Sequence, residues 1–310
     1  MAEAAGAWRV LAASLAGTSH IATGLPCQDA HGWRELPGGL LIAAVADGAG
    51  SASRSDEGAA IAVEAALDEL TARLIAGDVD CGPEPGQGPD PDLDLDQASS
   101  AVALRAAFAA AREALLARAA AEGFPARDLA CTLALAVVDA QALTAAQVGD
   151  GAVLARHADG TWQSLLEPQK GEYANEVLLL IAPEALQRMS LAQIPAPEAM
   201  VLSTDGLIRL MLRLPGGEPH PAFLDPLVAF ARQAADLAAA RRGLRSFLGS
   251  ERVCGRTDDD KTLLIALPPA ARSGASAAGE PPTGAPPIGE PPAGNPMTGD
   301  PPAGDPPAGT

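Results

Sequence analysis

The sequence predicts an α+β layered domain, and three observations support this. The chain has 310 residues with 48% apolar side chains, enough to bury a large core as one large domain or two small ones. Apolar runs of strand length are interspersed with alanine-rich segments that have a helical period. Helices come in pairs between groups of strands, which is typical of α+β layers.

In the first half of the chain, residues 8–17 and 39–46 are expected to be strands because both are short apolar runs. A helix is expected from about Ser53 to Ala76, and the side chains that could face a sheet are Ile61, Ala65, Leu67 and Leu70. A second helix is expected from Ala98 to Ala121, with an apolar stripe formed by Leu104, Phe108, Leu115 and Leu116.

In the second half, two strands are expected in hairpin fashion, CTLALAVVDAQ and LTAAQVGDGAVLARH (131–141 and 143–157). Shorter strands are expected at Trp162–Leu166 and Met200–Ser203. A late helix should span about Pro226–Leu248. Lys261–Leu267 should close the domain as a strand, so that the domain covers residues 1–268.

Two segments have low complexity. Residues 77–97 are acidic and rich in Gly and Pro, and we expect a mobile surface loop inserted between two helices. Residues 269–310 contain a five-residue Pro/Gly repeat from Gly279 onward, which disfavours helix and central strand and predicts a disordered tail. This tail is interpreted either as a docking segment for a proline-recognising partner or as a solvated spacer.

Composition disfavours several classes of protein. The formal net charge is −18, from 39 acidic and 21 basic residues, so no nucleic-acid partner and no membrane partner is expected. The four cysteines form no C-x-x-C pair, which disfavours a zinc knuckle or a disulfide framework. No run approaches the roughly 20 apolar residues of a membrane span, and no basic segment precedes the apolar N-terminus. We therefore expect a cytoplasmic protein.

Three aspartates stand where apolar strands meet turns of small residues: Asp47, Asp205 and Asp259. A single Asp-Gly after a strand is more often an ordinary turn. If folding brings all three together, their carboxylates form a preorganised oxygen site for hard divalent cations. Such a site favours phosphate chemistry with a metal-activated water.

Other phosphate chemistries are not supported. No arginine lies six residues after any cysteine, and there is no Walker-type loop and no G-x-S-x-G elbow. A nucleotide-phosphate loop at VADGAGSASRSDEG is conceivable, but Asp47 would repel phosphate there unless a cation intervened.

Six segments, in order along the chain, resemble the PPM or type 2C family of metal-dependent protein phosphatases: CQDAH (27–31), VADGAG (45–50), CTLALAVV (131–138), VGDGAV (148–153), LSTDGL (202–207) and DDDKTLL (258–264). They look most like the bacterial branch with a DGAGS motif in place of DGHGG. The resemblance implies a four-layer α/β/β/α sandwich, with two central antiparallel sheets flanked by helix pairs. It also implies hydrolysis of phosphoserine and phosphothreonine in proteins, through a water or hydroxide that bridges two Mn²⁺ or Mg²⁺ ions.

The resemblance also implies roles for individual residues. Asp47 would bridge the metals, Gly48 would bind through its carbonyl, and Asp205 and Asp259 would bind the first metal. A shift by one position within the acidic triplet stays open. Gln28 stands where the family often has a glutamate for the second metal. Asp29 would orient water, and the substrates would be phosphorylated proteins of a partner serine/threonine kinase.

Several positions depart from the family pattern. Asp150 matches a ligand of a third, weaker metal, but its usual aspartate partner is replaced by Arg209. The phosphate-binding arginine is replaced by Gly24, so His20, and after it Arg54, are candidates to hold the phosphate. The histidine of DGHGG is Ala49, and metal-bound water or His31 could take its place. Two alternatives therefore stay open: a catalytically weak, phosphatase-like binding module, and a small phosphate-ester hydrolase.

Overall fold

The computed structural model describes residues 7–76, 99–166 and 177–269. The chain divides into a compact unit, Met1–Ala270, and a second unit, Ala271–Thr310, which lies wholly outside the described residues. The predicted acidic loop and all of the predicted tail except Pro269 also lie outside them. Among the described residues, no helix is long and apolar enough to cross a membrane.

The first unit contains two five-stranded sheets. In the first sheet the order is β1 (Arg9–Leu15), β12 (Lys261–Leu267), β9 (Ala199–Ser203), β6 (Ala152–Arg156) and β7 (Trp162–Ser164). In the second sheet the order is β2 (Ala30–Leu36), β3 (Leu40–Ala46), β4 (Leu133–Val138), β5 (Ala142–Val148) and β8 (Ser190–Pro195). All neighbouring strands in both sheets are antiparallel.

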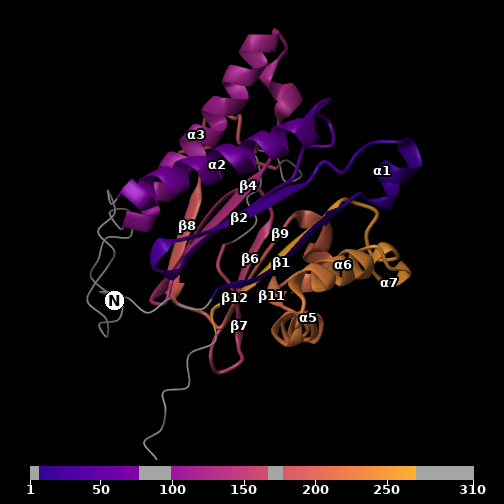
Figure 1. Ribbon diagram of the computed structural model, residues 1–310. Coiled ribbons are helices and arrows are strands. Elements are labelled where there is room, and N and C mark those ends of the chain that lie inside the picture. Colours follow the sequence, from indigo (N-terminus) through magenta and orange to yellow (C-terminus); the bar gives the residue numbers. More distant parts are fainter. Residues whose placement is uncertain (1–6, 77–98, 167–176, 270–310) are drawn as a thin grey trace, which may run out of the picture. The chain divides into compact units, whose positions relative to one another are not determined.

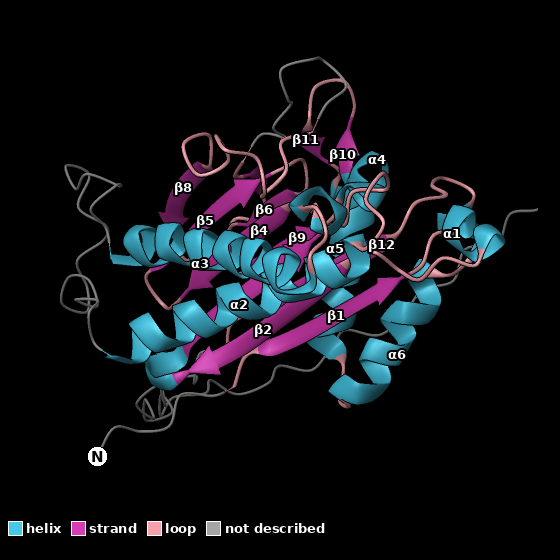
Figure 2. Ribbon diagram, turned by 90° about the horizontal axis from the view of Figure 1, so that it is seen from above, coloured by secondary structure: helices cyan, strands magenta, loops and turns pink. Residues whose placement is uncertain are grey.

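A pair of helices covers the outer face of each sheet (Figures 1 and 2). Helices α2 (Ser55–Ala76) and α3 (Ser99–Glu122) pack on the second sheet, and α5 (Pro221–Gln233) and α6 (Leu237–Leu248) pack on the first. Short elements complete the unit: α1 (Thr18–Thr23), η1 (Pro37–Gly39), η3 (Ala126–Leu129), η4 (Asp205–Leu207), α4 (Ile208–Met211), β10 (Leu212–Arg213), β11 (Glu218–Pro219) and α7 (Glu251–Cys254). The predicted four-layer α+β architecture is confirmed.

Strand β3 shows how the layers are held together. Its side chains alternate between the two faces of the sheet, as in any strand. Ile42, Ala44 and Ala46 join the core beneath α2 and α3, whereas Leu41 and Ala43 join the core between the two sheets. Since both faces of this strand are buried, it is a continuous apolar run, and this is why it could be predicted.

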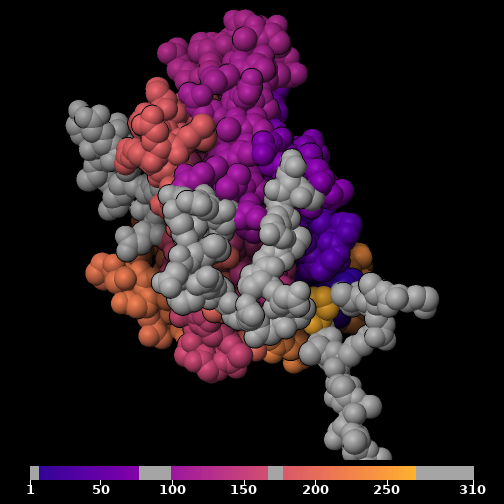
Figure 3. Space-filling model, turned by 90° about the vertical axis from the view of Figure 1, so that its left-hand side faces the viewer, coloured from indigo at the N-terminus to yellow at the C-terminus, as the bar shows by residue number. Residues whose placement is uncertain are grey.

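Alanine on the inner faces of α2 and α3 lets these two helices pack closely. The fully buried alanines are Ala59, Ala62 and Ala66 in α2 and Ala101, Ala107 and Ala111 in α3. The predicted stripes are confirmed at Leu67, Leu70, Leu104, Phe108 and Leu115, whereas Ile61, Ala65 and Leu116 are only partly buried. In Figure 3, α3 forms the top of the visible face and the β6–β7 hairpin its lower edge.

The single late helix predicted at Pro226–Leu248 is wrong, because the structure has two helices there. Helix α5 begins earlier, at Pro221, and ends at Gln233, after which Ala234 has an extended conformation. Asp236 then caps α6 by accepting hydrogen bonds from the backbone N–H groups of Ala238 and Ala239. The aspartate cap starts a new helix inside an otherwise continuous helical pattern.

The prediction of one strand over residues 143–157 is also partly wrong, because the structure has two strands there, β5 and β6. Strands β4 and β5 do form the hairpin, but the following residues cross over to the first sheet as β6. The crossing occurs at Gly149, whose φ of +120° is one that side-chain-bearing residues rarely adopt. Strands β2 and β8 and helix α1 were not predicted. The sequence of β2, AHGWREL, contains glycine and charged residues and so has no apolar run.

Candidate metal centre

A cavity of about 490 Å³ lies at one end of the sandwich, where β3 and β9 end and β12 begins. Both sheets and the turns between them contribute to it. Its lining residues are His20, Gln28, Asp47, Gly48, Ala49, Gly50, Ser51, Thr132, Asp150, Val177, Leu179, Asp205 and Asp259. Asp47, Asp205 and Asp259, which the sequence places at strand termini, therefore share one cavity.

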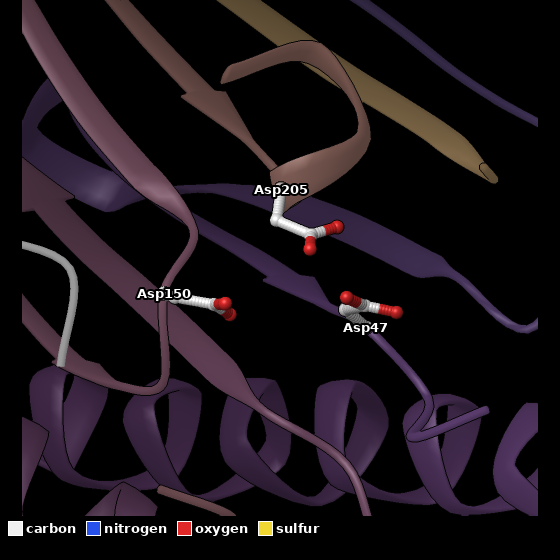
Figure 4. A group of neighbouring side chains, drawn as sticks. All are labelled: Asp47, Asp150 and Asp205. Atoms are coloured by element: carbon white, nitrogen blue, oxygen red, sulfur yellow. The ribbon is translucent and has the colours of Figure 1, made fainter. Parts of the chain in front are cut away.

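Three half-buried aspartates form the centre of this cavity. Asp47 follows β3, Asp150 lies in the turn that crosses between the sheets, and Asp205 begins η4 after β9. Each offers a carboxylate oxygen within 4.8 Å of the others, and their side chains point toward a common space (Figure 4). The structure thus brings Asp150 close to Asp47 and Asp205, although the aspartate that usually accompanies it is replaced by Arg209.

The carboxylates raise one another's pKa. Burial is the main cause of the raised pKa of Asp47, and the charges of Asp29, Asp205 and Asp259 add to it. Burial and the charges of Asp205 and Asp259 raise the pKa of Asp150 to about 6. The pKa of Asp205 is raised by burial and by Asp259. So many anions at close range favour either protonation or a bound cation.

Asp29 and Gln28 lie deeper in the site. Burial raises the pKa of Asp29 to about 7, although a hydrogen bond from Thr204 opposes the shift. Asp29 Oδ2 accepts that hydrogen bond from Thr204 Oγ1 at 2.8 Å. Asp29 Oδ1 and Gln28 Oε1 are both buried without a hydrogen-bond partner. Buried oxygens of this kind favour a partner such as a water or a cation, and Gln28 lines the cavity.

The backbone around Gly48 is held tightly. Its N–H donates to the carbonyl of Gln28 at 3.1 Å. A Cβ atom at Gly48 would lie 2.7 Å from that carbonyl and from Ser55, so only glycine fits here. Thr132 supports the neighbouring Asp47 twice, since its Oγ1 accepts from Asp47 N at 3.0 Å and its N–H donates to Asp47 O at 2.8 Å.

The members of the acidic triplet have different environments. Asp260 is buried, and its carboxylate accepts hydrogen bonds from Gly17 N at 2.6 Å, from His20 Nδ1 at 2.8 Å and from Gln28 N. Asp259 lines the cavity, with Oδ1 accepting from Asp260 N at 2.8 Å. Of the two, Asp259 has the carboxylate that faces the cavity, which favours it over Asp260 as a ligand.

The candidates for phosphate binding also differ. His20, on α1, lines the cavity. Arg54 instead pairs with Glu57 and Glu122 and stacks over Phe124.

His31 does not line the cavity either. Its Nδ1 lies 2.7 Å from Ser14 Oγ, and its ring stacks on Trp33. Burial, followed by the charge of Arg241, lowers its pKa. Of the histidines and arginines that the sequence suggested for the phosphate or the leaving group, only His20 lies at the site.

Reasoning from the sequence missed two supporting residues. Thr204 Oγ1 donates to Asp29 and accepts from Thr262 N at 3.1 Å, which joins β2, β9 and β12 at the site. Asp260 holds His20 and the backbone of Gln28 together. In the sequence, the feature that could have identified them is their position in two of the family-like segments: Thr204 lies in LSTDGL and Asp260 in DDDKTLL.

The residues present fit hard divalent cations. The cavity offers carboxylate, amide and backbone oxygens and no cysteine, and such donors suit Mg²⁺, Mn²⁺ and Ca²⁺. A bound cation would satisfy the two buried oxygens without partners and offset the repulsion between the crowded carboxylates.

Comparisons with known proteins agree with this chemistry. The family model described as Protein phosphatase 2C matches residues 16–249. The chain is 33% identical over 269 residues to Serine/threonine-protein phosphatase 3 of Escherichia coli (strain K12), covering 84% of this chain and 98% of the relative.

Solved structures share the fold at low sequence identity. PppA, described as a key regulatory component of T6SS in Pseudomonas aeruginosa, has a TM-score of 0.54 and 19% identity, over 85% of this chain and 99% of its own. Serine/threonine phosphatase Stp1 from Staphylococcus aureus has a TM-score of 0.53 and 12% identity, over 86% and 97%. Together with the family model and the curated relative, the site shows that the chain belongs to the protein phosphatase 2C family of metal-dependent serine/threonine phosphatases.

Proposed function

We propose that this protein removes phosphate from phosphoserine and phosphothreonine in proteins, with two Mn²⁺ or Mg²⁺ ions held in the cavity. The observation that carries the proposal is the group of Asp47, Asp150 and Asp205, whose oxygens lie within 4.8 Å of one another. The ligands would be Asp47, the Gly48 carbonyl, Asp205 and Asp259, with Gln28 toward the second ion. Asp150 would serve a third.

When bound, such ions lower the pKa of water and neutralise phosphoryl oxygens. The protein's own groups then orient the reactants. Asp29 Oδ2 is fixed by Thr204 at 2.8 Å, which leaves Oδ1 without a partner. We assign Asp29 to hold and orient a water beside the carboxylates, because a carboxylate kept in place by one oxygen can accept a proton with the other.

His20 is assigned to the substrate phosphate. Its Nδ1–H donates to Asp260 Oδ1 at 2.8 Å, so Nε2 is the ring nitrogen left for the substrate, and in the imidazolium form Nε2–H donates to a phosphoryl oxygen. This arrangement supplies a positioned polar group where Gly24 replaces the family's arginine.

The substrate class follows from the family and from the curated relative, which is a serine/threonine-protein phosphatase. We further propose that the substrates are products of a partner serine/threonine kinase and that the enzyme works in the cytoplasm. The proline-rich tail would be either a docking segment or a solvated spacer, and its removal distinguishes the two. The net charge of −18 favours basic or neutral segments around the phosphorylated residue.

The central test is hydrolysis of an aryl phosphate and of a phosphothreonine peptide. We expect activity with Mn²⁺ that disappears with a chelator. Asp47→Asn and Asp259→Asn should each lower kcat/KM by at least about 100-fold, because loss of a metal ligand should cost more than loss of its supporting partner. Asp258→Asn is the matched control, since Asp258 is exposed and does not line the cavity.

Comparable turnover after chelation, or in Asp47→Asn, would reject the proposal. Metal binding measured by calorimetry, without turnover on any phosphopeptide, would instead support the binding module. Turnover of small esters alone would support the small-ester hydrolase.

A further inference from the structure

A second cavity lies on the outer side of the first sheet, among α4, α5, α6 and α7, and has a volume of about 520 Å³. We call it the helix-side pocket. Figure 1 shows these C-terminal helices grouped together, away from α2 and α3. None of its lining residues belongs to the candidate metal centre.

The helix-side pocket is unusually aromatic for this chain. Aromatic residues make up 3% of the sequence, yet three of its five phenylalanines, Phe223, Phe230 and Phe247, line the pocket. Phe223 and Phe247 pack together with ring centroids 6.1 Å apart. Phe230 stays 42% exposed. Apolar side chains gathered at one cavity, rather than scattered singly over the surface, are typical of a binding surface.

The charge of the pocket is opposite to that of the protein. Its lining contains Arg209, Arg252 and Arg256 but no carboxylate, although the chain has 39 acidic residues and only 21 basic ones. Among the described residues, none of these arginines makes an ion pair or a side-chain hydrogen bond. Arg209 is also the residue that departs from the family's aspartate. Arginines without anionic partners at an apolar cavity favour an anionic ligand.

We propose that the helix-side pocket binds a small anionic amphiphile, a molecule with an acyl or aryl body and a carboxylate or similar anionic head. The apolar body would pack against the phenylalanines, and the head would pair with the arginines. A volume of about 520 Å³ suits such a ligand, because small-molecule pockets span roughly 300–1,000 Å³ and are mostly apolar with a few placed polar groups. The proposal goes beyond phosphatase activity and does not depend on it.

The test uses the full-length protein and measures binding without turnover. The probe is anilinonaphthalene sulfonate, an aromatic anion whose fluorescence rises in apolar sites. Decanoate, below its critical micelle concentration, and decanol, below its solubility limit, compete with it. We expect decanoate to displace the probe at about tenfold lower concentration than decanol, because charge-assisted hydrogen bonds favour the anion.

Three variants locate the site. The double variant Arg252→Gln, Arg256→Gln should weaken decanoate about tenfold and leave decanol unchanged. Gly243→Leu should remove probe binding by filling the pocket, since Gly243 lies in its lining and a Cβ there already meets Phe230 at 3.2 Å. Arg242→Gln is the matched control, an exposed arginine of α6 outside the lining.

If decanoate and decanol displace the probe at equal concentrations, the proposal that the pocket prefers an anionic ligand is wrong. If the Gly243→Leu variant still binds the probe and its melting temperature is unchanged, the helix-side pocket is not the binding site. If Gly243→Leu does not fold, the arginine variants still decide the proposal, because unchanged decanoate affinity in them overturns it.

Discussion

His20 is the residue whose role its surroundings define most closely. It lies on α1, a helix without buried residues, and among the described residues its ring pairs with Asp260. Asp260 is in turn fixed by backbone N–H groups of Gly17 and Gln28. This chain of contacts orients the imidazole without making it part of the core.

We therefore expect His20→Gln to lower kcat/KM by about 10- to 100-fold, the loss of one hydrogen bond to a charged group. The melting temperature should change little. Kinetics on a phosphopeptide, together with a thermal melt, measure both quantities. His157→Gln is the control, because His157 does not line the cavity and its ring lies 3.0 Å from Gln163 Oε1. A large fall in stability with unchanged kcat/KM would make His20 a structural residue.

The carboxylates of the site predict how stability depends on pH. Burial raises the pKa of Asp29 to about 7 and of Asp150 to about 6, from 3.8, and raises those of Asp47 and Asp205 as well. A carboxyl group with a raised folded pKa binds protons more tightly when folded. Its contribution to stability is therefore complete below the unfolded pKa and is lost as the pH rises through the folded value.

The metal-free protein should accordingly lose thermal stability between about pH 5 and about pH 8, and Mn²⁺ should stabilise it more at the higher pH. Thermal melts with chelator and with Mn²⁺ test this. In the Asp47→Asn variant, the melting temperature of the metal-free protein should depend less on pH. The lowered pKa values of Glu122, Asp159 and Asp236 act at lower pH. The lowered pKa of His31 acts in the same window with the opposite sign, because the folded ring binds its proton less tightly, and it offsets part of the loss. A metal-free melting temperature that rises across this range would contradict the prediction.

At the scale of elements, the contact between α2 and η3 supports the metal centre. Gly58 of α2 lies so close to η3 that a Cβ there would be 2.2 Å from the carbonyl oxygen of Leu129. The next carbonyl, that of Ala130, accepts the N–H of Ala49 at 2.9 Å. Helix packing therefore sets the position of the turn that carries Gly48.

Gly58→Ala should destabilise the protein by on the order of 1–2 kcal/mol, because the overpacking cost exceeds the gain in helix propensity. Gly243→Ala in α6 is a matched control, and we do not expect it to destabilise the protein. Its Cβ meets only the end of the Phe230 ring at 3.2 Å, so stability should hold or rise. Denaturant unfolding of both variants gives the comparison. A stabilised Gly58→Ala would show that η3 can move away freely.

At the scale of the whole molecule, the cores formed by the described residues extend as far as Leu267, and residues from Ala271 onward form a separate unit. Removal of residues 270–310 should therefore leave the melting temperature and the kcat/KM for a small aryl phosphate unchanged. Activity on a phosphoprotein substrate should fall if the tail is a docking segment and should persist if it is a spacer. A lower melting temperature after truncation would show that the tail belongs to the folded domain.

Much of the fold was predictable because its central strands and long helices carry strong local patterns. Strands β3, β4 and β12 are apolar on both faces, and α2 and α3 have buried stripes at helical spacing. The edge strands β2 and β8 were not predictable, because their side chains are mostly half-buried and lack such a pattern. The break between α5 and α6 escaped detection because a single capping aspartate produces it.

The residue types at the site could be predicted from the sequence, whereas the positions of these residues relative to one another could not. The strand-terminal aspartates and their glycines identify which groups could hold cations, since residue type and local turn are properties of short segments. Which of Asp258, Asp259 and Asp260 faces the cavity depends on partners more than two hundred residues away, namely Gly17, His20 and Gln28. The closeness of Asp150 to Asp47 and Asp205 likewise depends on how two sheets pack, and no local pattern contains that distance.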